Sequence, residues 1–369
     1  MKKLYINMDK KTVFLLGLSI AILAVMLYFV GIDKVIEALK IAKWEYIAIG
    51  IAMQLFTYYL YTLRWKILND VANINVGIKK LLPMVLVGLA VNNITPSGRG
   101  GGEPVRAYIL SREENYPMEE TFATVVADRA LDTFPFVVLA VITIVGVSFY
   151  YNFNKWLIVV MILAVIAIVI ILAIIIYMSI NPNFGNRVEG WIIGLSRRFY
   201  KKNSEEFEEK IHKVIKDFQR TMRHMIYNKK VMYYALPLSF VIWIFEIFRV
   251  YFVFLAFGAN INPVVIGQVF IMASLVGMIP LLPGGVGAVD GIMVVFYSAA
   301  GVTASISMAA TLIERLISFW MAIIIGLCIL PYYGTSVLDK ISRSSSDDEL
   351  EEASEDGPTD RKLYFNILS

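Results

Sequence analysis

The sequence lacks most of the residues on which soluble enzymes and metalloproteins depend. It contains one cysteine, Cys328, which lies in an apolar run, so no intrachain disulfide and no cysteine metal site are expected. Both histidines, His212 and His224, fall in one long polar segment, which leaves no histidine for acid–base chemistry within the apolar runs. The H-E-x-x-H, D-D-x-x-D and G-x-x-x-x-G-K-[ST] patterns are absent, which argues against metalloprotease, prenyl-transfer and ATP-hydrolysing activity. We therefore expect neither an enzyme nor a bound cofactor or metal.

Charged residues are scarce as well, and they are unevenly placed. They make up 17% of the 369 residues, and apolar residues make up 58%. Soluble proteins have about 25% charged and about 45–50% apolar residues. Because roughly 20 apolar residues span a bilayer core of about 30 Å, the sequence predicts an all-α, multi-pass membrane protein. The uncharged runs that carry this prediction cover 12–32, 46–63, 81–98, 133–154, 156–186, 250–289, 291–313 and 316–338.

Glycine and proline divide these runs into two kinds. Residues 79–112 and 263–300 are apolar but broken in the middle, and backbone freed by such a break cannot face lipid, where nothing satisfies its N–H and C=O groups. We therefore predict two re-entrant helical hairpins, each of which enters and leaves by the same face. The hairpin glycines are Gly98, Gly100, Gly101 and Gly102 in the first, and Gly284, Gly285 and Gly287 in the second. Full spans are predicted at 12–32, 44–66, 118–150, 155–180, 231–257 and 303–330.

Lysine and arginine set the predicted orientation of the membrane domain, residues 1–335. They gather in 64–80 and 181–230, whereas 151–155 and 258–263 together hold only Lys155. We therefore predict a protein of the cell membrane, and the positive-inside rule places both of its termini in the cytoplasm. Loop 33–43, which this orientation places outside, fits the rule less well because it also carries lysines. The net charge of +4 comes from these loops and indicates topology rather than nucleic-acid binding.

Two polar segments lie outside the predicted spans. Segment 181–230 has the apolar spacing of two amphipathic helices, which favours helices on the cytoplasmic membrane surface and leaves a docking surface for a partner as the alternative. Residues 336–369 form an acidic tail with seven acids between Asp347 and Asp356, and we expect it to be disordered.

The two broken stretches match each other, which indicates an internal duplication. The first motif is followed by Asp128-Arg129 and the second by Glu314-Arg315, while Arg64 and Arg249 precede them at similar distances. We place repeat one at about 44–150 and repeat two at about 231–330, joined by span 155–180 and segment 181–230. Three full spans separate their starts, so the second copy is inverted, as in transporters that work by alternating access. The matching motifs are Pro96-x-Gly98-x-Gly100-x-x-Glu103 and Pro283-x-Gly285-x-Gly287-x-x-Asp290.

Charges inside the predicted membrane region mark the candidate site. Each would cost roughly 2.5–3.5 kcal/mol at a helix centre unless it is paired or faces a cavity. One interpretation is purely structural: ion pairs lock each hairpin against the following helix. The other is a substrate- or proton-linked role, in which the glycines expose backbone N–H groups to an anion such as phosphate. Glu103 and Asp290 would repel that anion unless they are neutralised. The candidate substrate-binding residues are Arg99, Glu103, Arg106, Asp128, Arg129, Arg249, Asp290, Glu314 and Arg315; Asp132 and Glu246 also lie within apolar spans.

Three segments resemble the transmembrane region of lysylphosphatidylglycerol synthases. They are NNITPSGRGGGEPVRA over 92–107, Asp128-Arg129, and LPGGVGAVD over 282–290, and the similarity covers about 10–335. In the full-length synthases this region acts as a flippase for the aminoacylated lipid, so the resemblance implies a lipid translocase with paired re-entrant helices. It points to Arg99, Glu103, Arg106, Asp128, Arg129, Asp290, Glu314 and Arg315. Those synthases have a large soluble transferase domain after the membrane part, and here only about 39 residues follow the last predicted span, so we expect no synthase activity.

The sequence is compatible with several functions. The prediction is a flippase-type translocase whose partner is a membrane lipid, either an anionic phospholipid or a lipid linked to a polyprenyl phosphate. The alternative is a proton- or sodium-coupled secondary transporter of a small solute, and a channel or scaffold is a weaker one. No nucleic-acid partner is expected, and the sequence leaves a homodimer open.

Overall fold

The computed structural model describes residues 32–95, 101–150, 155–181, 187, 190, 204–277 and 285–333, and every element in this part of the chain is helical. The long apolar runs form helices because in a bilayer only a helix or a closed barrel satisfies all backbone N–H and C=O groups. The elements are α2 (Ile32–Lys40), α3 (Trp44–Val71), α4 (Ile78–Ile94), α5 (Gly102–Glu114), α6 (Met118–Tyr150), α7 (Lys155–Ile180), α9 (Ser204–Tyr227), the π-helix η1 (Val231–Ala235), α10 (Leu236–Ala256), α11 (Pro263–Gly277), α12 (Ala288–Ala299), α13 (Ala304–Arg315), the π-helix η3 (Leu316–Trp320), α14 (Met321–Ile329) and the 3-10 helix η4 (Leu330–Tyr333).

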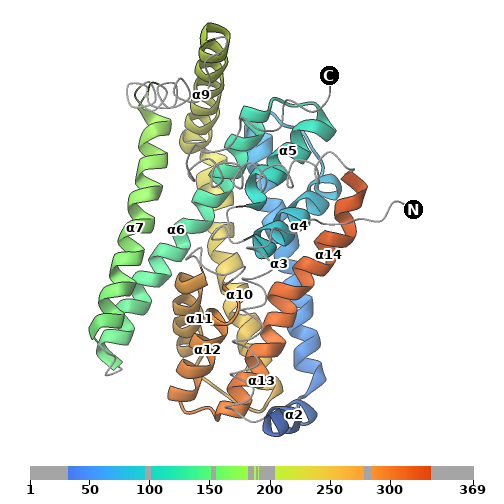
Figure 1. The fold of residues 1–369 in the computed structure, drawn as a ribbon, viewed down its shortest axis with the longest axis vertical. Helices are drawn as coiled ribbons and strands as arrows, with labels where there is room; N and C mark the ends of the chain where they lie inside the picture. The colour runs from blue at the N-terminus through green and yellow to red at the C-terminus, as the bar shows by residue number, and fades with distance from the viewer. Residues whose placement is uncertain are drawn as a thin grey trace, which may run out of the picture.

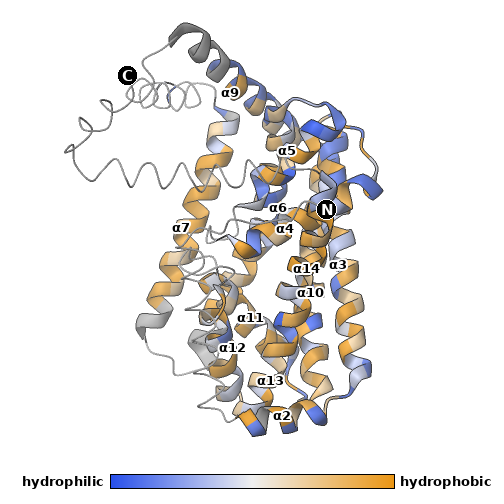
Figure 2. Cartoon of the chain, turned by 45° about the vertical axis from the view of Figure 1, so that its right-hand side comes forward, coloured by the Kyte–Doolittle hydropathy of each residue, from blue (hydrophilic) through white to orange (hydrophobic). Residues whose placement is uncertain are grey.

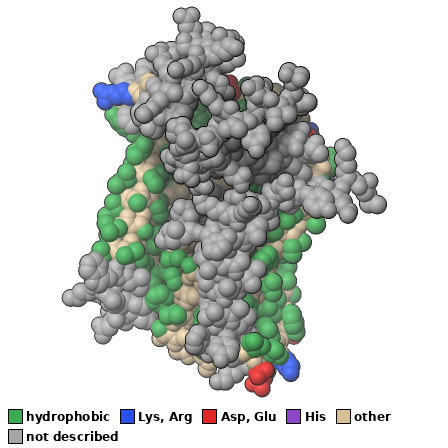
Figure 3. Space-filling model, in the orientation of Figure 1, with side chains coloured by type: hydrophobic (Ala, Val, Ile, Leu, Met, Phe, Trp, Pro, Cys, Tyr) green, Lys and Arg blue, Asp and Glu red, His purple; other side chains and the backbone are tan. Residues whose placement is uncertain are grey.

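Five helical segments in the described part are long and apolar enough to cross a membrane. They are Trp44–Val71, Met118–Gly146, Val159–Ser179, Val231–Ala256 and Ala304–Tyr333. This confirms five predicted spans to within a few residues, and the predicted span 12–32 lies outside the described residues. Hydrophobic side chains predominate on the flanks of the molecule that are coloured in Figure 3. Hydrophilic residues gather around α5 and at the end of α9 that lies close to α5 (Figure 2).

The two broken stretches form two pairs of short helices. α4 packs against α5, and α11 packs against α12. These helices have 17, 13, 15 and 12 residues, too few for a core that needs roughly 20. The α4–α5 pair lies in the upper half of Figure 1 and the α11–α12 pair in the lower half. That both pairs re-enter the membrane stays a prediction, because their joining segments, 96–100 and 278–284, lie outside the described residues.

The two repeats are inverted about a central pair of helices, α3 and α10. The ring centroids of Phe56 and Phe245 lie 5.3 Å apart, and further along α3 a guanidinium nitrogen of Arg64 lies 3.2 Å from the Ser239 hydroxyl. Residue numbers therefore rise on one helix as they fall on the other, so the helices are antiparallel. The hairpins also cross over, because α4 packs on α14 of repeat two and α11 packs on α6 of repeat one.

Each repeat interrupts its last long helix at an equivalent point. Pro135 lies inside α6 and removes one backbone hydrogen bond shortly after Asp128-Arg129. In repeat two the π-helix η3, Leu316–Trp320, follows Glu314-Arg315 directly. Both features disturb regular α-helical hydrogen bonding, and each is of a kind at which helices commonly bend.

Helix α9 does not use its apolar face as predicted. Met222 and Met225 are 1% exposed and pack in a cluster with residues of α3 and α6, and the Phe218 ring lies 6.3 Å from that of Phe122 on α6. The part of this face formed by Phe218, Met222 and Met225 is therefore covered by protein rather than by lipid headgroups, whereas Val214 is 47% exposed. Segment 191–203, which holds the other predicted amphipathic stretch, lies outside the described residues.

Candidate functional site

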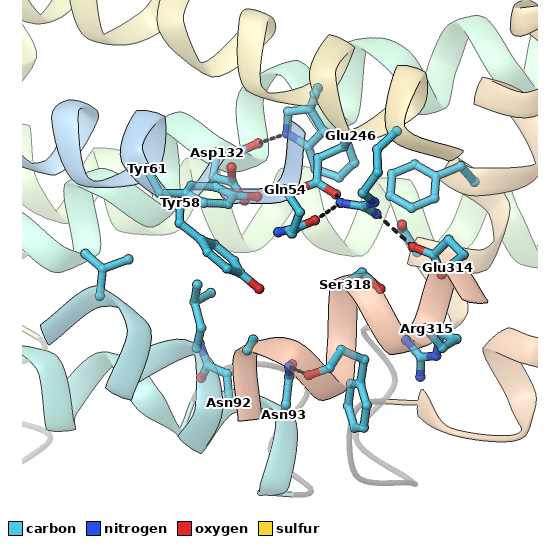
Figure 4. A pocket seen from close by; sticks show the side chains of 18 of the residues that line it. Gln54, Tyr58, Tyr61, Asn92, Asn93, Asp132, Glu246, Glu314, Arg315 and Ser318 are labelled. Atoms are coloured by element: carbon cyan, nitrogen blue, oxygen red, sulfur yellow. Dashed lines mark hydrogen bonds and ion pairs between the residues drawn. The ribbon is translucent and has the colours of Figure 1, made fainter. Parts of the chain in front are cut away.

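A cavity of about 150 Å³ lies between the two repeats. Its wall is formed by side chains from α3, α4, α5 and α6 of repeat one and from α10 to α14 of repeat two. The aromatic side chains of Tyr58, Trp243 and Phe270 line it together with charged and amide groups. Tyr58, Gln54 and Glu314 are among the lining residues labelled in Figure 4. The site therefore needs both copies, and neither repeat encloses it alone.

In repeat one, three arginines and three carboxylates form an alternating series. The Nε atom of Arg64 on α3 lies 2.7 Å from Asp128 Oδ1, and its Nη1 atom lies 2.9 Å from Asp132 Oδ1. Arg106 on α5 binds the other oxygen of Asp128 at 2.9 Å. At the far end, Arg129 pairs with Glu103 and lies 3.7 Å from Asp132 Oδ2. Each carboxylate thus has at least one guanidinium partner.

In repeat two, the same pattern recurs with fewer cations. Arg249 on α10 donates to Glu314 at 2.8 Å, and also pairs with Glu246 one turn earlier. Arg315 lies 2.9 Å from Asp290 Oδ1. In Figure 4 the carboxylates of Glu246 and Glu314 approach the same guanidinium, that of Arg249. One guanidinium therefore serves two carboxylates in this repeat.

The acid–arginine dipeptides pair in the same way in both copies. The acid, Asp128 or Glu314, binds the arginine of the central helix, while the arginine, Arg129 or Arg315, binds the acid at the start of the hairpin's second helix. This confirms that ion pairs tie each hairpin to the following helix. The partners are not the adjacent residues of each dipeptide, because neighbouring side chains on a helix point in different directions.

Arg129 on α6 and Arg315 on α13, the arginines of the two acid–arginine dipeptides, differ in their exposure. The Arg129 side chain is 42% exposed, whereas the Arg315 side chain is 10% exposed. Arg64, Arg106 and Arg249 are also buried. Arg129 is therefore the most exposed guanidinium among the described lining residues.

Asn92 fixes the start of the second helix in the first hairpin. Its carbonyl oxygen accepts a 2.6 Å hydrogen bond from the Gly102 N–H, and its amide donates to Glu103 Oε1 at 3.1 Å. A Cβ atom on Gly102 would lie 1.9 Å from the Gly88 carbonyl oxygen, so only glycine permits this approach of α5 to α4. The first hairpin is therefore closed by backbone contact.

The second hairpin uses its own acid for the same purpose. Asp290 Oδ2 accepts a 2.7 Å hydrogen bond from the Gly287 N–H at the start of α12. Gly285 and Gly287 have φ of 67° and 86°, in the left-handed region that favours glycine. Both glycines therefore turn the chain at the start of α12, and Asp290 complements the helix N-terminus while it binds Arg315.

Most of the predicted site residues meet at this cavity, and some important ones were missed. Arg106, Asp128, Arg129, Arg249, Glu314 and Arg315 line it, and Glu103 and Asp290 bind lining arginines. Arg99, Gly98, Gly100 and Gly284 lie outside the described residues.

The prediction missed some residues of the site. Arg64, Asp132 and Glu246 also line the cavity, and the signal that could have identified them was a charge within a predicted apolar span. Gln54 carried no comparable signal, because a single amide in an apolar run is common, whereas Asn92 begins the segment 92–107 that carries the family resemblance but was not among the predicted site residues. In the described part, no three His, Cys, Asp or Glu side chains gather as metal ligands.

The fold and the site define a multi-pass, all-α membrane protein built from two inverted repeats around a charged internal cavity. The chain belongs to the lysylphosphatidylglycerol synthase transmembrane-region family, whose model matches residues 14–326. It is 48% identical to a UPF0104 membrane protein of Methanothermobacter thermautotrophicus, over 90% of this chain and 99% of that one. It is also 32% identical to a UPF0104 membrane protein of Methanocaldococcus jannaschii, over 87% of this chain and 94% of the relative.

A more distant relative has a second part that this chain does not match. Glycosyltransferase AglD of Haloferax volcanii is 22% identical over 84% of this chain, and the match covers 52% of AglD. The membrane fold therefore occurs both in proteins of about this length and as one part of a longer protein.

Proposed function

We propose that this protein is a lipid translocase that moves an anionic phospholipid or a lipid linked to a polyprenyl phosphate between the two leaflets. The observation that carries the proposal is the charged cavity between inverted repeats, with the 42% exposed guanidinium of Arg129 in its wall. Membership of a family named for the membrane region of a lipid-modifying synthase supports a lipid as the substrate class.

The chemistry of the wall suits a phosphate headgroup. A guanidinium binds phosphate oxygens through a planar set of donors and keeps its charge in a low-dielectric site. The carboxylates that flank Arg129 hold it in place, and a phosphate that displaces one of these contacts replaces one anionic partner with another. The lipid tails need not enter the cavity, because they stay in the surrounding bilayer while the headgroup crosses.

The inverted arrangement of the two repeats suggests how the headgroup could cross the membrane. In a protein of two inverted repeats, exchange of the two repeat conformations moves the opening from one side to the other around a fixed site. The unequal exposure of Arg129 and Arg315 is the asymmetry that such an exchange would reverse. The equivalent breaks at Pro135 and at η3 offer places where the long helices bend.

A vesicle assay tests the proposal. The purified full-length chain is reconstituted with trace amounts of nitrobenzoxadiazole-labelled phosphatidylglycerol, phosphatidylcholine or polyprenyl phosphate, and dithionite is added to bleach the outer leaflet. We expect protein-containing vesicles to lose signal from both leaflets with an anionic probe. Bleaching equal to that of empty vesicles, for all the probes, would overturn the proposal. Uptake of a water-soluble solute without lipid movement would favour the coupled small-solute transporter instead.

A further inference from the structure

We infer that Tyr58 and Ser318 form a subsite of the cavity that binds the hydroxyl groups of an uncharged polyol, such as glycerol or a sugar, carried on the headgroup phosphate. The inference rests on the proposed function for the phosphate and for the lipid. The subsite itself rests on two hydroxyl groups that the fold leaves without hydrogen-bond partners.

Tyr58 on α3 provides the first hydroxyl. The residue is 3% exposed and lines the cavity, and its hydroxyl oxygen is buried with no hydrogen-bond partner. The side chain of Gln54, one turn earlier on α3, approaches this oxygen but does not meet it in hydrogen-bonding geometry. A buried hydroxyl that lacks a partner is destabilising, so its presence in the wall of a cavity points to a ligand.

Ser318 in the π-helix η3 provides the second hydroxyl. Serines within helices often donate to the carbonyl oxygen four residues earlier, as Ser179 and Ser239 do at 2.7 and 3.1 Å. In the described part of the chain Ser318 makes no such bond, although it lines the same cavity. Figure 4 labels Tyr58 and Ser318, and no dashed line reaches either hydroxyl.

The inverted repeat shows what the equivalent pair does on the other side of the cavity. Tyr58 and Trp243 each precede the arginine of their central helix by six residues. Ser318 and Asp132 each follow the arginine of their acid–arginine dipeptide by three. The indole N–H of Trp243 donates to the backbone carbonyl of Asp132 at 3.2 Å, whereas no hydrogen bond joins Tyr58 to Ser318. The contact is therefore made on one side of the inversion and open on the other, where it leaves both hydroxyls for a ligand.

The chemistry of the two groups selects an alcohol as their partner. Each hydroxyl has one O–H donor and acceptor lone pairs, so it is best matched by a group that also donates and accepts. An alcohol does both, whereas a phosphate oxygen only accepts and an ammonium group only donates. Neither side chain carries a charge, so the pair does not offset the cost of removing a charged group from water.

The subsite lies in the same cavity as the proposed phosphate site. Arg129, Tyr58 and Ser318 all line this space of about 150 Å³, and the two hydroxyls come from different repeats. A phosphate at Arg129 can therefore place its substituent at the hydroxyls. The subsite would then determine which headgroups the translocase prefers, namely those whose phosphate carries a polyol.

Two soluble esters that differ only in their hydroxyl groups test the subsite. Glycerol phosphate, as either enantiomer, and propyl phosphate share their charge and chain length. Each is titrated by calorimetry into the full-length protein in phosphatidylcholine nanodiscs. Because a neutral hydrogen bond contributes about two- to tenfold in affinity, glycerol phosphate should bind severalfold more tightly. Equal affinities for the two esters would overturn the subsite.

Variants assign the preference to the two residues. Tyr58→Phe and Ser318→Ala should each weaken the binding of glycerol phosphate by about two- to tenfold and leave that of propyl phosphate unchanged. The matched control is Tyr233→Phe, because Tyr233 is 72% exposed and does not line the cavity. An undiminished preference for glycerol phosphate in Tyr58→Phe would overturn the assignment.

Thermal unfolding separates a ligand-binding hydroxyl from a structural one. Since the Tyr58 hydroxyl has no partner, its removal in Tyr58→Phe should leave the unfolding midpoint unchanged or raise it. A lower midpoint would show that the hydroxyl is bonded within the folded protein, and would overturn its assignment to a ligand.

The binding and vesicle assays together distinguish this inference from the proposed function. Preferential binding of glycerol phosphate without any lipid movement would overturn the proposed function and leave the subsite standing. Equal binding of both esters together with lipid movement would overturn the subsite alone. Binding of neither ester would overturn both the subsite and the phosphate site at Arg129.

Discussion

Arg64 on α3 and Arg249 on α10 occupy equivalent positions in the two repeats, and each extends to the helix that carries the other. Arg64 lies 3.2 Å from the Ser239 hydroxyl on α10, and Arg249 donates to the Gln54 side chain on α3. Ser239 and Gln54 each precede the arginine of their own helix by ten residues. The two contacts are therefore related by the same inversion as the repeats, and they join α3 of repeat one to α10 of repeat two.

Loss of the exposed guanidinium should stop translocation. Arg129→Ala removes the group proposed to bind the phosphate, and a hydrogen bond to a charged group contributes about 1.5–3 kcal/mol. The bleaching rate of the inner leaflet should therefore fall by about tenfold or more, with partial recovery in Arg129→Lys. The matched control is Arg220→Ala, because Arg220 also pairs with two acids but lies outside the cavity. Equal rates in Arg129→Ala and the control, at equal reconstitution, would contradict the assignment.

Arg64 should matter more for stability than any exposed charge. Its side chain is 2% exposed and binds two carboxylates, so Arg64→Met takes one guanidinium partner from each of Asp128 and Asp132 in a buried site, at a cost of about 3–5 kcal/mol. Unfolding of the detergent-solubilised protein, followed by circular dichroism, measures this loss.

Lys66→Met provides the comparison for Arg64→Met. Lys66 lies two residues further along the same helix and pairs with Asp70 at the surface, so its loss should cost at most about 1 kcal/mol. Similar losses for the two variants would mean that the Arg64 pairs are weak.

Gly102 should not accept a side chain. A Cβ atom there would overlap the Gly88 carbonyl, so Gly102→Ala must separate α4 from α5 and should destabilise the protein by about 1–3 kcal/mol. Gly77→Ala is the control, because Gly77 has φ of −73° and no atom within 4 Å of the added Cβ. Thermal unfolding midpoints of the two variants test the difference, and an unchanged midpoint in Gly102→Ala would show that the hairpin is not closed by this contact.

The inversion predicts opposite sides for two equivalent loops. The loop before α4 contains Asn75 and the loop before α11 contains Asn260, and both residues are exposed. In a Cys328→Ala background, a membrane-impermeant maleimide should label Asn260→Cys on intact cells, and should label Asn75→Cys only after permeabilisation. Labelling of both from the same side would disprove the predicted topology.

Part of the site was predictable from the sequence, because a charged residue inside an apolar run is destabilising unless it is paired or faces a cavity, and therefore marks a candidate site residue. Glu103, Asp128 and Arg129 were predictable in this way, and the duplicated motif added Asp290, Glu314 and Arg315. Asp132 and Glu246 carried the same signal of charge but have no acidic counterpart in the other repeat, so the matching of repeats did not select them.

The sequence by itself determined the class of protein, the positions of five long helices, and the duplication. These follow from local properties: the length of apolar runs, the backbone demands of a bilayer, and a repeated spacing. Only the tertiary structure decided which acid binds which arginine, since the pairs join residues as far apart as Arg249 and Glu314. It also decided that one guanidinium is exposed while its counterpart is buried. Pairing and exposure depend on how α3, α10 and the two hairpins pack in space, and no local pattern specifies that packing.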